Sequence, residues 1–258
     1  MVPPRTGLVN NRGAVPAIGL RFAYAPVSSM SATDRDALWT VYASFFDTDR
    51  AAFDLAVGRA DEVLRYHDPA GGRLCGMGLL SAYSERHQGR AFRVLWTSAV
   101  CLEPAYRGLN AIHRAGLFRL ALERIRHPFS NVYWCFDTFS YKSYLLLPRN
   151  LAEYWPRRDQ PTPAWESGVL EVLARRHGRE AWNPTSGIIR AQGRRLRPGV
   201  ADVPPHDADP DIRYFLDRNP GHAAGERLPC LCPLNARNVA AIAWTAIRRI
   251  FRRAFARD

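Results

Sequence analysis

Hydrophobic and polar positions change their period several times along the chain, and each change predicts an element. Residues 20–26 alternate, as a strand with one buried face does. Ser31 followed by Asp34 is a helix-start signal, because a serine side chain caps a helix and an acidic residue is favourable in its first turn. A second helix is expected over 51–66, closed by the Pro- and Gly-containing break at 68–72.

Strands are also expected over 73–83 and, after the turn at 88–90, over 94–102. The last of these stops before Pro104, and a polar turn leads into an amphipathic segment that ends near Arg126. The apolar positions of that segment keep helical spacing: Ile112, Ala115, Gly116, Leu117, Leu120, Ala121 and Ile125. A strand that enters a helix through a Gly-containing turn points unpaired N–H groups above the helix start, which suits a phosphate.

This strand–turn–helix block resembles the GNAT acyltransferase superfamily. Members carry an apolar-x-apolar-x-Pro strand end, matched by Val-x-Leu-x-Pro at 100–104, and a Tyr-Arg-Gly-x-Gly-x-Gly turn, whose start is matched at 106–108. The later glycine positions hold Asn110 and Ile112. Asparagine tolerates left-handed backbone and is the milder departure, whereas the branched Ile112 would crowd a phosphate.

The resemblance implies an α/β fold, with a mixed central sheet flanked by helices over residues 20–155. An arm at 1–19 precedes this GNAT-like domain. A Pro/Gly-rich extension with one helix is expected over 156–229, and a basic amphipathic helix over 230–258. The family order of strand, two helices, three strands, helix, strand and helix agrees with the predicted elements.

The resemblance also implies a site for a coenzyme A thioester. The turn amides would hold the pyrophosphate, and a backbone N–H of the preceding strand would hold the carbonyl oxygen. The pantetheine arm would lie where that strand parts from the strand at 131–136. Arg107 would add paired N–H groups for a phosphate. The expected donor-binding residues are Val100, Cys101, Leu102, Arg107, Gly108, Leu109, Asn110, Ala111 and Ile112.

In many members a tyrosine on the next short helix protonates the leaving thiolate. Residues 137–144 match the family's Asn-x-x-Ala-x-x-apolar-Tyr pattern, with aspartate in place of asparagine. Tyr144 is therefore the expected general acid, and Tyr141 the alternative if the register shifts; simple packing at a helix end is the other interpretation. If Tyr144 is the acid, Tyr144→Phe should lower turnover by about 10²–10⁴-fold.

The general base stays unassigned, because the central strand has Trp-Thr-Ser at 96–98 where many relatives place a glutamate. Glu85, Asp137 and His113 are candidates, and a relayed water or an already neutral acceptor are alternatives.

The first helix carries an aromatic stripe, most of which is typical of core packing. In the family this helix walls the acceptor site, so Trp39, Tyr42 and Phe46 are also expected to bind substrate. An acyl chain or acceptor larger and more apolar than acetate and a simple amine would suit such a wall.

The chain has 258 residues, enough for one sizeable core with extensions. Its formal charge is +12, and almost all of its basic residues are arginines. A coding bias explains this composition, but the charge still favours anionic partners such as nucleotides, acyl carrier protein or anionic lipid. No nucleic-acid module is recognisable, so nucleic acid is the weaker expectation. Five cysteines, an odd number, predict no disulfide framework and favour a cytoplasmic setting.

No metal site is expected, because the Cys-x-Cys pair at 230–232 is too closely spaced for the usual zinc pairs. The amino-terminal residues lack the apolar core of a signal peptide, and no apolar run has the length of a membrane span.

The last segment, 238–257, is apolar on one side and rich in arginine on the other. Two interpretations stay open: binding to an anionic membrane surface at the inner face, or docking on the domain with the arginines in water.

Together these patterns predict an N-acyltransferase that moves an acyl group from acyl-CoA or acyl carrier protein to a primary amine on a small molecule, peptide or lipid precursor. The length of the acyl chain stays open, with a long chain among the alternatives. A non-catalytic relative that serves as a binding or membrane-associated scaffold is the alternative, favoured by the missing strand glutamate and the altered turn. An ordinary α/β domain would also explain the strand–turn–helix block.

Overall fold

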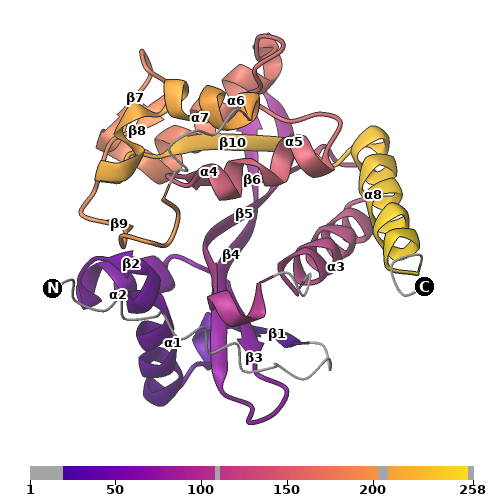
Figure 1. Cartoon of the computed structure of the whole chain (residues 1–258). Coiled ribbons are helices and arrows are strands. Elements are labelled where there is room, and N and C mark those ends of the chain that lie inside the picture. Colours follow the sequence, from indigo (N-terminus) through magenta and orange to yellow (C-terminus); the bar gives the residue numbers. More distant parts are fainter. Residues whose placement is uncertain (1–19, 108–110, 203–208, 255–258) are drawn as a thin grey trace, which may run out of the picture.

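The computed structural model describes residues 20–107, 111–202 and 209–254, with side chains up to Thr245 in the last range. Its centre is a mixed six-stranded sheet (Figure 1). The strands in sheet order are β1 (Arg21–Pro26), β3 (Glu62–His67), β4 (Leu74–His87), β5 (Arg90–Leu102), β6 (Val132–Thr138) and β10 (Leu228–Pro233). All neighbours are antiparallel except β5 and β6, which are parallel because a helical crossover connects them.

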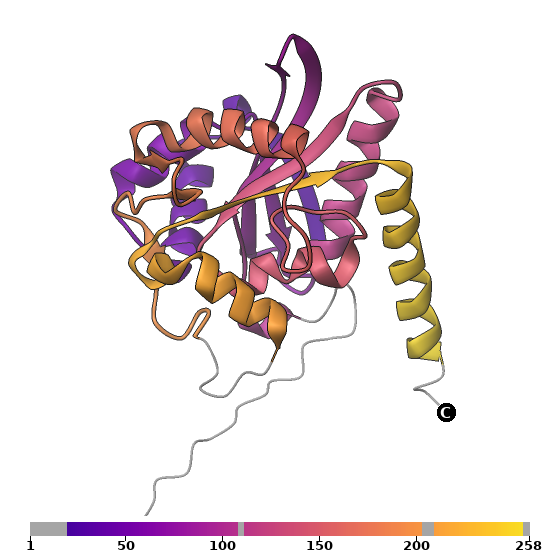
Figure 2. The same cartoon turned by 90° about the horizontal axis from the view of Figure 1, so that it is seen from above.

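Helices cover both faces of this sheet (Figure 2). On one face, α1 (Ala32–Phe45) and α2 (Arg50–Gly58) pack on β3 and β4, and α6 (Ala164–Gly178) packs on β5, β6 and β10. The other face carries α3 (Ala111–Arg126), α4 (Tyr141–Tyr144), α5 (Leu146–Asn150) and α7 (Pro210–Arg218). The expected α/β fold class is confirmed.

Local signals explain where several helices begin. The Ser31 side chain accepts a hydrogen bond from the Asp34 amide, and the Asp34 carboxylate accepts one from the Ser31 amide. The two bonds form the expected capping box of α1. Asp49 caps α2 through the Ala52 amide. The predicted helix over 51–66 is wrong in its second half, because α2 ends at Gly58 and residues 62–67 form β3, whose buried Val63, Leu64 and Tyr66 pack in the sheet.

The carboxyl-terminal extension returns to the sheet. Its strand β10 pairs with β6 from Leu228↔Thr138 to Pro233↔Tyr133, and α7 precedes it; the sequence indicated neither. Two short ribbons complete this part: β2 (Phe46–Asp47) with β9 (Arg195–Leu196), and β7 (Trp182–Asn183) with β8 (Ile188–Ile189).

The last helix, α8 (Ala236–Ala254), stands at the end of the molecule where α3 lies (Figure 1). Asn238 anchors its first turn and is fully buried: its side chain accepts from the Ala152 and Glu153 amides and donates to the Glu153 and Pro233 carbonyls. Ile242 packs against the core. No helix among the described residues has the length and apolar character needed to cross a membrane.

Candidate active site

The parallel strands β5 and β6 part halfway along their length. They pair from Arg93↔Val132 to Trp96↔Cys135, and β5 continues to Leu102 beyond the last pair. A bulge marks the same place on the other edge of β5, since its register with β4 passes from Leu79↔Ser98 to Met77↔Cys101. Ala99, in this bulge, has a left-handed φ of 54°. The bulge twists β5 and lets it diverge from β6.

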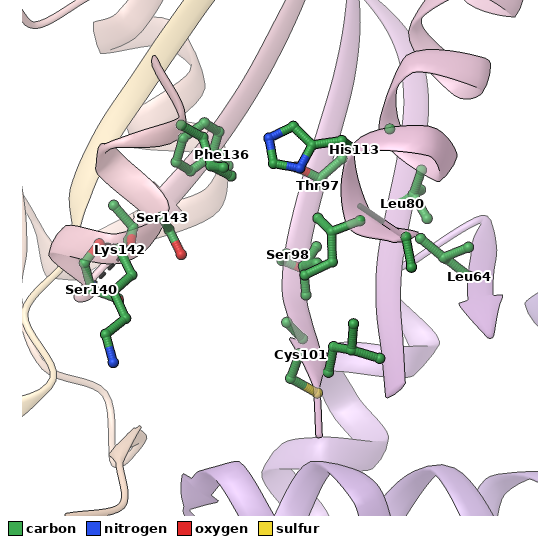
Figure 3. Close-up of a pocket in the computed structure, with 18 of the residues that line it drawn as sticks. Leu64, Leu80, Thr97, Ser98, Cys101, His113, Phe136, Ser140, Lys142 and Ser143 are labelled. Carbon is green, nitrogen blue, oxygen red and sulfur yellow. Dashed lines mark hydrogen bonds between the residues drawn. The ribbon is translucent and has the colours of Figure 1, made fainter. Parts of the chain in front are cut away.

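A cavity of about 460 Å³ opens from this gap toward α3 (Figure 3). Its walls come from β5, β6, α3 and α4, with Ile242 and Thr245 of α8 at one side. Most of the lining is apolar, including Leu64, Leu80, Leu95, Leu120, Phe45 and Phe136. Such a volume is within the range of small-molecule sites, and the lining suits a hydrocarbon chain.

A second pocket, of about 280 Å³, lies on the opposite face of the sheet, between α1, α2 and α6. Ser98, Asp137 and Arg194 line both hollows. These three residues therefore form a shared boundary of the two hollows near the gap between β5 and β6, here called the junction.

Most of the expected donor-binding residues line the larger cavity. Val100, Cys101 and Leu102 do so from β5, Arg107 from the turn, and Ala111 and Ile112 from the start of α3. Gly108, Leu109 and Asn110 lie outside the described residues. Arg107 is exposed, and its Nε donates to the Leu102 carbonyl at 3.1 Å. Burial raises the pKa of the Cys101 thiol to about 12, so this cysteine is a neutral wall group.

The aromatic stripe of α1 divides between several environments. Phe46 lines the larger cavity, and Tyr42 lines the smaller pocket. Trp39 lines neither hollow and packs on Tyr42 and Phe53. The structure thus places part of the expected substrate wall at the site and part in the core.

Neither expected general acid reaches a hollow. Tyr144 is fully buried among Tyr154, Tyr214 and Phe215, and its hydroxyl donates to the Pro156 carbonyl at 3.1 Å. Burial raises its pKa far above the usual range. The Tyr141 hydroxyl donates to the Asp202 carbonyl at 3.2 Å. On the same short helix, Ser143 lines the larger cavity and points its hydroxyl into it (Figure 3).

The candidate bases lie in different places. Asp137 lines both hollows; its side chain is only 3% exposed and pairs with Arg227 at 2.7 Å. His113 lines the larger cavity. Glu85 lines neither hollow and pairs with Arg176 at 3.1 Å. Of these candidates Asp137 alone reaches the junction of the hollows.

Sequence reasoning missed the residues that the extension supplies. His177 of α6 lines the smaller pocket, stacks on Trp96 with ring centroids 3.5 Å apart, and hydrogen-bonds through Nε2 to the Tyr83 hydroxyl at 2.6 Å. Arg194 and Arg227 reach the junction from loops before β9 and β10. A lone histidine and scattered arginines carry no periodic signal, so only the fold reveals their convergence. The described residues hold no cluster of His, Cys, Asp and Glu suited to a metal ion.

No family model matches this sequence, and no curated protein matches it either. Several solved structures share part of the fold. A probable N-acyltransferase of Enterococcus faecalis V583 is 14% identical, with a TM-score of 0.38 over 49% of this chain and 31% of its own. A Pseudomonas aeruginosa acyl-CoA N-acyltransferase is 16% identical, with a TM-score of 0.33 over 45% of this chain and 78% of its own.

A ribosomal-protein-alanine N-acetyltransferase of Brucella melitensis biovar Abortus 2308 is 16% identical, with a TM-score of 0.39 over 56% of this chain and 98% of its own. The match to the Enterococcus faecalis protein covers about a third of that protein's length. Likenesses this remote assign no substrate. The observed strand order and the parting of β5 from β6 agree with the mixed α/β sheet that the GNAT resemblance implies.

Proposed function

We propose that this protein is an N-acyltransferase that moves an acyl group from a coenzyme A thioester to a primary amine. One observation carries the proposal: an apolar cavity and a pocket lined by charged side chains lie on opposite faces of the sheet and share a boundary where β5 and β6 part. Acyl transfer requires the amine nitrogen to reach the carbonyl carbon of the thioester. At this junction the two molecules would approach each other from separate sides of the sheet.

The larger cavity is assigned to the donor. Pantetheine would pass the open edge of β5, and the acyl chain would extend among the apolar residues under α3. The lining favours an acyl group longer than acetyl. The exposed Arg107 beside the cavity would contact a phosphate of the nucleotide. A carrier protein could present the same thioester arm, and the donor comparison below distinguishes the two.

The smaller pocket is assigned to the amine. Its nitrogen would attack the thioester carbonyl carbon, the C–S bond would break, and an amide and a thiol would form. A backbone N–H of residues 100–102 would donate to the oxygen as it gains charge. We assign proton acceptance to Asp137, because its carboxylate lies at the junction. The Ser143 hydroxyl faces the cavity and would relay a proton, donating its own to the thiolate while it regains through water the proton that Asp137 took from the amine.

Release of free coenzyme A thiol tests the proposal. Acetyl-, octanoyl- and palmitoyl-CoA would be combined with a panel of amines and the thiol followed by a reagent dye, with octanoyl and palmitoyl carrier protein as parallel donors. All five cysteines are buried thiols, so a blank without donor should be low. Amine-dependent thiol release is the expected result. Donor binding without release from any donor would instead indicate the scaffold role.

Membrane contact of residues 238–257 stays a prediction from the sequence. Trp244 is 62% exposed and Val239 48% exposed, so the described part of α8 presents apolar side chains to solvent. Flotation of the protein with anionic liposomes tests the idea. Absence from the lipid fraction would leave α8 with its packing role beside the cavity.

A further inference from the structure

The smaller pocket is strongly basic. Its single carboxylate, Asp137, is already paired with Arg227. His177 adds no charge, because burial lowers its pKa to about 4 and keeps it neutral near pH 7. The arginines that line the pocket are Arg59, Arg179, Arg194 and Arg227. Positive charge is therefore in excess around whatever binds there.

Arg194 is the half-buried cation of this set without a carboxylate partner, since Arg59 and Arg179 are exposed and Arg227 pairs with Asp137. Its Nη1 donates to the Tyr42 hydroxyl at 3.0 Å, and its guanidinium carbon lies 5.5 Å from the Phe46 ring centroid and 5.4 Å from that of Phe139. Among the described residues no carboxylate forms an ion pair with it. A half-buried guanidinium has five N–H donors and is costly without an anion. Its remaining donors are available to a ligand.

The pocket's size limits that ligand. At about 280 Å³ it suits a small molecule better than a nucleotide. The planar guanidinium of Arg194 matches a carboxylate through two parallel N–H bonds. Arg194 and Asp137 both line the junction, so an anion and an amine joined by a short link could be held together.

We infer that the acceptor is a small amine that also carries a carboxylate, with the carboxylate on Arg194 and the amine next to Asp137. This inference rests on the proposed acyl transfer and names its acceptor class. Amino acids are the simplest molecules of this class.

Equilibrium binding tests it without turnover. The intact protein, saturated with free coenzyme A, would be titrated by calorimetry with alanine, leucine and phenylalanine, each against its amide. Ethanolamine and O-phosphoethanolamine form a further pair. The amino acids should bind on the order of tenfold more tightly than their amides, because a charge-assisted bond is lost in the amide. Amides that bind as tightly as the acids would overturn the inference. So would an increase in affinity from ethanolamine to O-phosphoethanolamine that exceeds the increase from amide to acid.

Arg194→Met and Arg195→Met form a matched pair of variants. Arg195 is exposed, pairs with Asp47 and lines neither hollow. Arg194→Met should abolish the preference for acid over amide, and Arg195→Met should keep it. Arg194→Lys keeps the positive charge but cannot form two parallel N–H bonds, so it should retain part of the preference. This variant provides a second test if Arg194→Met does not fold. A preference that survives in a folded Arg194→Met would overturn the assignment.

The two proposals fail separately. A binding preference for acids without thiol release from any donor would contradict the acyl transfer and leave an anion site. Equal thiol release with acids and amides would support the transfer and contradict the carboxylate acceptor.

Discussion

At the scale of single residues, position relative to the two hollows decides which side chains can do chemistry. Tyr144 matches a family pattern in sequence, yet its hydroxyl is committed to the Pro156 carbonyl. Its neighbour Ser143 faces the cavity. Successive residues of a helix point in directions about 100° apart, so a match of spacing cannot fix which of two neighbours faces the cavity.

Ser143→Ala and Tyr144→Phe therefore test the site against the pattern. Ser143→Ala should lower turnover at least about tenfold with little change in donor affinity, because it removes the hydroxyl assigned to the thiolate. Tyr144→Phe should cost about 1 kcal/mol of stability through its lost hydrogen bond and leave turnover nearly unchanged. Steady-state kinetics and denaturant unfolding check both. The reverse outcome would restore Tyr144 as the acid.

A buried ion-pair network supports α3 below the site. Glu123 is 1% exposed and accepts from Arg93 and Arg119, each at 2.7 Å. Burial alone would raise its pKa, but these hydrogen bonds outweigh it and hold the pKa below its ordinary value of 4.5. Glu123→Gln should cost about 3 kcal/mol near neutral pH, because the half-buried Arg93 loses its carboxylate partner and the buried Arg119 keeps only Glu62.

The pH dependence follows from the direction of that shift. A carboxyl with a lowered pKa in the folded state stabilises fully above its unfolded pKa, and the stabilisation disappears as the pH falls through the folded value. The difference between wild type and Glu123→Gln should thus narrow below about pH 4.5 in urea titrations. Glu171→Gln, in an exposed pair with Arg175, is the control and should change little. A difference in the free energy of unfolding between wild type and Glu123→Gln that does not change with pH would contradict this account.

At the scale of elements, the bulge in β5 creates the site. The β-rich run at 94–102 predicted a strand but not the extra residue opposite Gly78, because a bulge leaves no periodic signal. The strand β10 was missed for a related reason: buried on both faces, it shows no alternation. The capping box of α1 was predictable, since it depends on two residues only a few positions apart.

Substitution of Ala99 tests the bulge. Its φ of 54° suits glycine and opposes a β-branched residue. Ala99→Val should cost about 1–2 kcal/mol and weaken donor binding, whereas Ala99→Gly should be close to neutral. Denaturant unfolding and donor titration measure both effects. Equal stability of the two variants would mean that the left-handed backbone at Ala99 is not maintained.

At the scale of the whole molecule, the sheet separates the two hollows that the proposal assigns to donor and acceptor. The central block of the sequence predicted the donor side, because a strand, a turn and a helix that are close in sequence form it. The acceptor side combines Tyr42 of α1, Trp96 of β5 and side chains of the extension that are far apart in the chain. Their convergence depends on how α6 and β10 pack, and short-range patterns do not encode that.

The measurement that tests the central claim most directly is the melting-temperature shift caused by acetyl-, octanoyl- and palmitoyl-CoA, in wild type and in Gly116→Leu. Gly116 lines the larger cavity, and a Cβ atom added there meets no other atom within 4 Å, so a larger side chain can be introduced at this position. Gly116→Ala, the control, should raise stability by about 1 kcal/mol through helix propensity.

If the acyl chain occupies this cavity, the shift should grow with chain length in wild type and in Gly116→Ala, because tighter ligands stabilise more. Gly116→Leu should lose the gain for the longer chains and keep the acetyl-CoA response. The absence of a shift with any donor, or identical responses in all three proteins, would contradict the assignment of the cavity to the acyl donor.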